Sequence, residues 1–114
     1  MIEMGRKSTA QKLLEELPQQ DGHDETLLLL YDFHGGPPHP RFYANLHRIT
    51  ELTCNGSSLV QYSAYKTKSL KAALAAHTLA SQMGAETVIF EAAEVSPDDL
   101  RRRLKEAQEE RNMT

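Results

Sequence analysis

The sequence predicts a small domain in which strands and helices alternate, and three stretches support this prediction. The run "LLLLYDF" at residues 27–33 would be apolar on both faces of a strand, which is typical of a central position in a sheet. The stretch "LVQYSAYK" at 59–66 alternates with a period of two, and "ETVIFEA" at 86–92 is a third strand candidate. Helical spacing separates these stretches, so the expected order within 26–92 is strand, helix, strand, helix, strand.

Two architectures fit this order. One is a three-stranded parallel α/β sheet. The other is an α+β, ferredoxin-like β-α-β-β-α-β fold, in which the middle strand splits into a hairpin between Leu59 and Lys68. Ten residues are few for a hairpin, so the residue pattern alone slightly favours the parallel sheet.

The two helices between the strand candidates have clear signals. Residues 40–53 place Phe42, Leu46 and Ile49 on one face, directly after the proline- and glycine-rich loop "HGGPPHP". The second of these helices is expected to begin after Ser69 as N-cap. It should end before Gly84, which suits the left-handed position that follows a helix.

A further helix is expected at each end of the chain. Ser8 and Gln11 have the spacing of a capping box, and Pro18 should end that first helix. "SPDD" at 96–99 is a helix start, and the helix that follows has only a narrow apolar stripe. We therefore divide the chain into an N-terminal helix and linker (1–25), a core domain (26–95) and a C-terminal helix (96–114).

Composition limits the classes of function. The chain has 114 residues, enough for one core, and its formal net charge of −3 is unlike that of a basic nucleic-acid-binding domain. Cys54 is the only cysteine, which excludes a disulfide framework. No signal pattern and no long apolar run are present, so we expect a cytoplasmic protein that does not enter the membrane.

Asp32 is the first candidate for chemistry, because it ends the most apolar run in the chain. It could bind a hard divalent cation such as Mg²⁺, or it could accept backbone N–H bonds from the turn that follows. No second carboxylate stands at a suitable spacing beside it. His34 and His39 flank "GGPP" and could bind a transition metal, but no third ligand is evident.

Positive charges are dispersed along the chain. Arg41 lies on the first core helix, and Lys66, Lys68 and Lys71 lie around the junction between the second strand and the next helix. Lys66 and Lys68, beside Tyr62 and Tyr65 of that strand, could form a small ridge that contacts phosphates.

Taken together, "LLLLYDF", the helix containing "RFYANLHRI" and "VQYSAYK" at 60–66 resemble one family. This is the small CRISPR-associated adaptation protein, once described as a CRISPR endoribonuclease, with the related virulence-associated D toxins. The resemblance covers residues 27–92. It implies a ferredoxin-like fold, a homodimer, and a strand-end aspartate, matched by Asp32, that binds a divalent metal and acts in catalysis.

The resemblance therefore implies a homodimer that binds DNA or RNA, with Arg41, Lys66, Lys68 and Lys71 as contacts and Mg²⁺ or Mn²⁺ at Asp32 for nuclease action. Whether catalysis survives in this chain is left open. The alternative is a non-enzymatic protein-interaction or small-ligand sensor domain, with a protein partner bound through the terminal helices.

Overall fold

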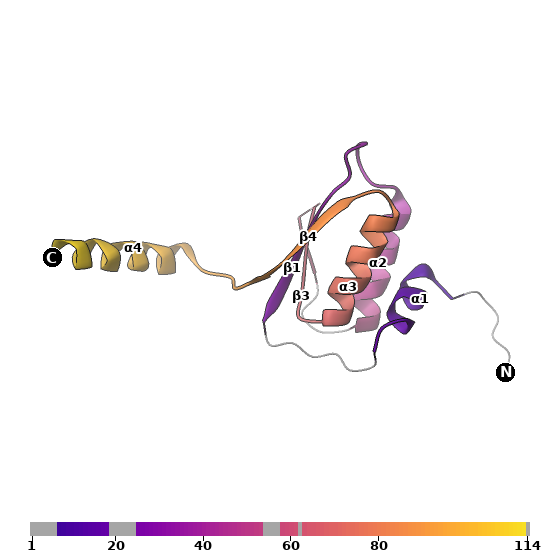
Figure 1. Cartoon of the computed structure of the whole chain (residues 1–114), viewed down its shortest axis with the longest axis horizontal. Helices are drawn as coiled ribbons and strands as arrows, with labels where there is room; N and C mark the ends of the chain where they lie inside the picture. The colour runs from indigo at the N-terminus through magenta and orange to yellow at the C-terminus, as the bar shows by residue number, and fades with distance from the viewer. Residues whose placement is uncertain (1–6, 19–24, 54–57, 62, 114) are drawn as a thin grey trace.

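The structure is a computed structural model that describes residues 7–18, 25–53, 58–61 and 63–113. Within these residues the fold is α+β, with four helices and a four-stranded antiparallel sheet of order β2-β3-β1-β4. Helices α2 and α3 cover one face of the sheet, and α1 packs against these two helices (Figure 1). The core lies between the helices and the sheet.

The strands are β1 (Thr26–Asp32), β2 (Ser58–Gln61), β3 (Ala64–Thr67) and β4 (Glu86–Ala92). β1 is central, as its two-sided apolar character predicts, and it pairs antiparallel with β3 on one side and β4 on the other. β2 and β3 form the hairpin of the second predicted architecture. The predicted parallel sheet is wrong, because two residues between the strands suffice to reverse the chain direction.

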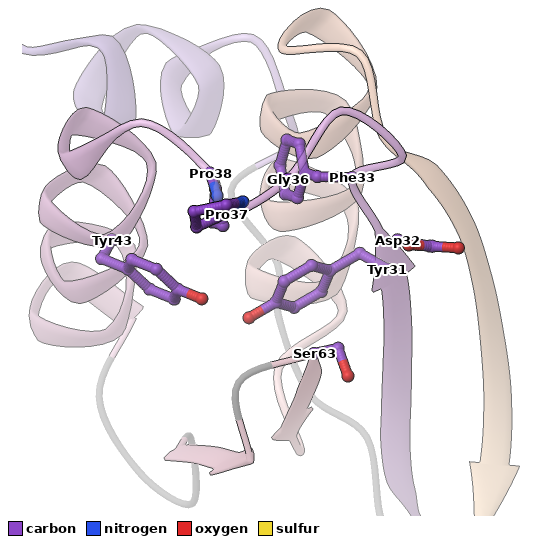
Figure 2. A pocket seen from close by; sticks show the side chains of 8 residues that line it. All are labelled: Tyr31, Asp32, Phe33, Gly36, Pro37, Pro38, Tyr43 and Ser63. Carbon is purple, nitrogen blue, oxygen red and sulfur yellow. The ribbon is translucent and has the colours of Figure 1, made fainter.

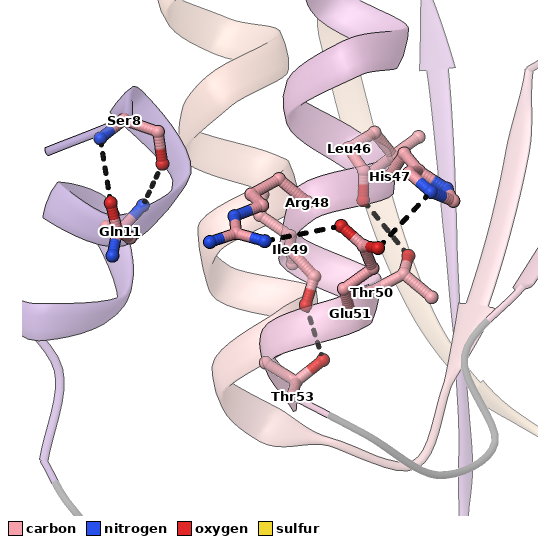
Figure 3. A network of polar contacts seen from close by, with 9 residues as sticks. All are labelled: Ser8, Gln11, Leu46, His47, Arg48, Ile49, Thr50, Glu51 and Thr53. Carbon is pink, nitrogen blue, oxygen red and sulfur yellow. Dashed lines mark hydrogen bonds and ion pairs between the residues drawn. The ribbon is translucent and has the colours of Figure 1, made fainter.

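The helices are α1 (Thr9–Glu15), α2 (Pro40–Thr53), α3 (Leu70–Gln82) and α4 (Pro97–Asn112). The capping box of α1 is present, since Ser8 Oγ accepts from the Gln11 N–H and the Gln11 side chain accepts from the Ser8 N–H (Figure 3). Ser69 caps α3 through the Ala72 N–H, and Ser96 caps α4 through the Asp99 N–H. Gly84 follows α3 with φ +96°, as predicted.

Side chains from α1, α2, α3 and the sheet fill one core. Helix α1 contributes Ala10, Leu13 and Leu14 to it. Helix α3 presents alanines to its neighbours, which lets it lie close to α2 and the sheet. The buried apolar residues of the helices and central strands include Leu13, Leu14, Leu29, Tyr31, Phe42, Leu46, Ile49, Tyr65, Ala76 and Leu79.

Polar contacts fix α2 against the sheet. The Thr50 hydroxyl donates to the Leu46 carbonyl at 3.0 Å, and the Thr50 and Tyr65 hydroxyl oxygens lie 2.8 Å apart. The same helix carries the Thr53–Ile49 hydrogen bond and exposed ion pairs of Glu51 (Figure 3). Tyr65 is 1% exposed beneath α2, so its ring belongs to the core of this chain.

Helix α4 projects away from the rest of the chain, on the side of the sheet opposite α2 and α3 (Figure 1). It accounts for much of the 72 Å long axis of the molecule, and none of its residues is buried. Its apolar stripe, Leu100, Leu104 and Ala107, is exposed, as the sequence predicted for a surface helix or a helix that awaits a partner. None of the described helices has the length and apolar character needed to cross a membrane.

Candidate functional site

Several ionisable side chains meet at the end of β1. Asp32 is the last residue of β1, and its cross-strand partner is Glu86, the first residue of β4. Cross-strand partners share a face, so both carboxylates lie on the face of the sheet that α2 and α3 leave open. Sequence reasoning found no second carboxylate at a suitable spacing beside Asp32. It missed Glu86, which antiparallel pairing of the first and last strands would have identified.

His34 lies between these two carboxylates. Its Nε2 is 3.0 Å from Glu86 Oε1, and its Nδ1 is 3.4 Å from Asp32 Oδ2. All three side chains are exposed, so each ion pair contributes little to stability. The turn after Asp32 is closed by the Phe33 carbonyl, which accepts from the Gly36 N–H at 3.2 Å. Asp32 is thus paired with His34 and is not the residue that closes this turn.

The arrangement fits a divalent cation poorly. Because each ring nitrogen of His34 faces a different carboxylate, the three side chains do not converge on one point. Among the described residues, no group of three or more His, Cys, Asp or Glu side chains could hold a metal ion. Mg²⁺ at this position would have to use Asp32 and Glu86 alone, with His34 displaced and water completing the shell.

The basic residues do not form one surface. Lys66 lies on β3, on the open face of the sheet, with Nζ 3.9 Å from Glu94. Lys68 and Lys71 follow at the start of α3, near the end of the sheet where β1 begins, because Thr67 pairs with Leu27. Arg41 lies in the first turn of α2, which follows the loop at the opposite end of β1. The structure therefore brings the three lysines near one another and separates them from Arg41.

Two other histidines among the described residues have local structural contacts. His39 Nδ1 accepts a hydrogen bond from the Arg41 N–H at 3.0 Å, at the start of α2. His77 Nδ1 lies 2.6 Å from Thr87 Oγ1 and joins α3 to β4. Cys54 lies outside the described residues.

A cavity of about 350 Å³ opens beside Asp32, between the end of β1, the loop that follows it and α2 (Figure 2). A second hollow of about 310 Å³ adjoins it on the side of β4. The side chains around the first cavity are mostly apolar. Its lining residues are Tyr31, Asp32, Phe33, Gly36, Pro37, Pro38, Tyr43 and Ser63.

Tyr31 is the most perturbed titratable group in the described chain. Burial, together with the neighbouring Tyr43, raises the pKa of the Tyr31 phenol well above its ordinary value. Sequence reasoning took the ring only as part of an apolar strand. The six-residue stretch "GGPPHP" that follows it, rich in glycine and proline, was the available sign that the chain bends around an open space here.

A second unusual feature is the exposure of β4. It is an edge strand, and Val88, Ile89 and Phe90 are 45%, 36% and 50% exposed. Val88 and Phe90 pair with Leu30 and Leu28, so these four side chains form an apolar patch on the open face. Ile89 points to the other face, which α3 covers only in part, and it remains 36% exposed there.

No family model, curated protein or solved structure matches this chain. Function is therefore inferred from the arrangement of its own residues.

Proposed function

We propose that this chain is a homodimeric, ferredoxin-like interaction domain whose two copies pair through β4. The observation that carries the proposal is the exposed apolar edge, Val88–Ile89–Phe90. Natural edge strands are usually protected by proline, by lysine or by covering elements. β4 contains neither proline nor lysine, and its charged residues, Glu86 and Glu91, lie near its two ends.

The order of the elements supports the ferredoxin-like assignment. Each half of the core is a strand-helix-strand unit, β1-α2-β2 and β3-α3-β4, and the two units interleave in a sheet of order β2-β3-β1-β4. This is the split arrangement expected of that fold. In it, β4 forms one edge of the sheet and is available for pairing with a second copy.

The energy of such a pairing favours a dimer of moderate affinity. Completing the burial of a half-exposed Val, Ile or Phe contributes about 1 kcal/mol, so six such side chains from two copies contribute about 6 kcal/mol. New backbone hydrogen bonds between the β4 strands add to this, and the entropy lost on association subtracts from it. We expect a dissociation constant on the order of micromolar.

Helix α4 is the surface that we assign to a further protein partner. Of the two terminal helices, α1 buries Ala10, Leu13 and Leu14 in the core, whereas no residue of α4 is buried. An amphipathic helix that extends from a folded domain is a common form of protein recognition. The dimer through β4 and the partner bound to α4 are thus separate surfaces.

Sedimentation equilibrium between about 1 and 100 μM tests the dimer. The wild-type chain should change from monomer to dimer over this range, and Phe90→Lys should remain monomeric with an unchanged circular dichroism spectrum. Leu104→Lys, which adds the same charge on α4, is the matched control and should dimerise like the wild type. A wild-type chain that is monomeric at 100 μM, or a Phe90→Lys variant that still dimerises, would refute the proposal.

Metal-dependent binding of nucleic acid, as the family resemblance implies, is the second candidate function. The observation that favours it is the pair of carboxylates of Asp32 and Glu86 on the same face of the sheet as Lys66. Binding to a labelled 20-base-pair duplex or a 20-nucleotide RNA should then weaken steeply between 50 and 200 mM salt. Lys66→Ala should reduce that slope, and absence of binding at 50 mM salt would exclude this candidate.

A further inference from the structure

The cavity beside Asp32 has an apolar wall and one buried polar atom. Aromatic rings and prolines form most of its surface, and in Figure 2 the Asp32 carboxylate points away from it, toward β4. The side chains that face the space are therefore uncharged. Its volume, about 350 Å³, is at the lower end of the range for small-molecule sites.

The buried polar atom is the Tyr31 hydroxyl. Tyr31 is only 4% exposed, and its hydroxyl has no hydrogen-bond partner among the described residues. The Tyr43 hydroxyl points toward it across the cavity (Figure 2), and a weak polar contact with Tyr43 adds to the raised pKa of the Tyr31 phenol, although the two groups do not form an ordinary hydrogen bond. Buried hydroxyls in native proteins almost always have a partner, so an orphaned one that points into a cavity indicates that a partner comes from outside the chain.

The walls hold the cavity open before any ligand arrives. Phe42 lies behind it, with its ring centroid 5.0 Å from that of Tyr31 and 5.2 Å from that of Tyr43. Pro37 and Pro38 stiffen the loop above, and the Tyr31 N–H donates to the Ser63 carbonyl at 3.1 Å below. A site whose walls are already ordered loses little entropy when it binds.

We propose that this cavity binds a small, uncharged, aromatic molecule that carries a hydrogen-bond acceptor such as a carbonyl oxygen. The acceptor lies between the Tyr31 and Tyr43 hydroxyls, and the ring of the ligand packs among Phe33, Pro37 and Pro38. A phenol keeps its proton at neutral pH, so the Tyr31 hydroxyl acts as the donor. The site is separate from the β4 edge, so it does not depend on the proposed dimer.

Benzamide and toluene are suitable probes, because both carry one ring and only benzamide carries an acceptor. Saturation-transfer NMR and chemical-shift titration of the full chain at millimolar probe would measure binding. Benzamide should bind, and Tyr31→Phe should weaken it about tenfold, the loss of one hydrogen bond. Tyr31→Phe should leave toluene binding unchanged.

Tyr65→Phe is the matched control, because it also removes a buried phenol hydroxyl, at a place outside the cavity where that hydroxyl is bonded to Thr50. It should leave benzamide binding unchanged and lower the melting temperature, whereas Tyr31→Phe should leave the melting temperature equal or higher. No benzamide binding at 10 mM to the folded wild type, or equal weakening by Tyr31→Phe and Tyr65→Phe, would overturn the proposal.

Discussion

In the hydrogen bond between Thr50 of α2 and Tyr65 of β3, Tyr65 is the donor, so removing either hydroxyl should cost a different amount of stability. The single hydroxyl proton of Thr50 is donated to the Leu46 carbonyl, so the Tyr65 hydroxyl must be the donor in the 2.8 Å contact with Thr50 Oγ1. Thr50→Val removes the acceptor and leaves the donor of a 1% exposed tyrosine without a partner. That change should cost about 1–3 kcal/mol of unfolding free energy.

Tyr65→Phe should cost less, about 0.5–1.5 kcal/mol, because half-buried Thr50 keeps its bond to Leu46 and water can reach its free lone pair. Removing both hydroxyls leaves no orphaned donor. The double variant Thr50→Val/Tyr65→Phe should therefore be more stable than Thr50→Val alone, with a coupling energy of about 1 kcal/mol.

Urea unfolding followed by circular dichroism would measure these differences, with a shift of the midpoint of about 0.5–1 M for Thr50→Val. Protein concentration must be the same in all samples, because dimerisation adds to apparent stability. A Tyr65→Phe variant less stable than Thr50→Val, or strictly additive costs in the double variant, would refute the assigned direction of the bond.

Three further predictions concern single residues. Burial raises the Tyr31 pKa above its ordinary 10.0, so the unfolded chain loses this proton first as the pH rises. The unfolding free energy of the wild type should therefore fall above pH 10.0, and that of Tyr31→Phe should fall less, as measured by urea midpoints at pH 8 and 11. An equal fall in the two proteins would contradict this prediction. Gly84→Ala, at φ +96° with no atom near the added Cβ, should lose about 1–2 kcal/mol from backbone strain alone, whereas Gly35→Ala as control should be neutral or slightly stabilising in the same assay. Asp32→Asn should change unfolding free energy by less than about 0.5 kcal/mol, and 5 mM Mg²⁺ should shift its melting temperature no less than that of the wild type; a Mg²⁺ effect that needs Asp32 would favour the second candidate function.

Local signals in the sequence predicted the elements of the fold well. The caps at Ser8, Ser69 and Ser96 and the left-handed Gly84 act within one turn of chain, so each can be recognised without knowledge of the rest of the fold. The sequence pattern alone did not favour the hairpin between β2 and β3. Whether such a short hairpin is stable depends on the pairing of β3 with β1, which the number of residues between the strands does not reveal.

The site was harder to predict, because it is made by residues far apart in the chain. Glu86 meets Asp32 only through the β1–β4 register, and Tyr31 meets Tyr43 only through the course of the loop between them. The burial of Tyr65 also depends on the rest of the fold, since period-two alternation identifies the two faces of a strand without stating which one the helices cover.

Pairing of two copies through β4 is the central claim, and a cysteine scan along this strand tests it most directly. In a Cys54→Ser background, single cysteines would be placed at Val88, Ile89 and Phe90, with Leu104→Cys on α4 as control, and disulfide-linked dimers counted after mild oxidation. Antiparallel pairing brings the residue nearest the two-fold axis within about 4.5–5.5 Å of its own copy, a Cα separation that a disulfide can span. Pairing through β4 should give rapid cross-linking at one β4 position or at two adjacent ones, and none at position 104. Cross-linking at Leu104→Cys alone, or at no position of β4, would contradict it.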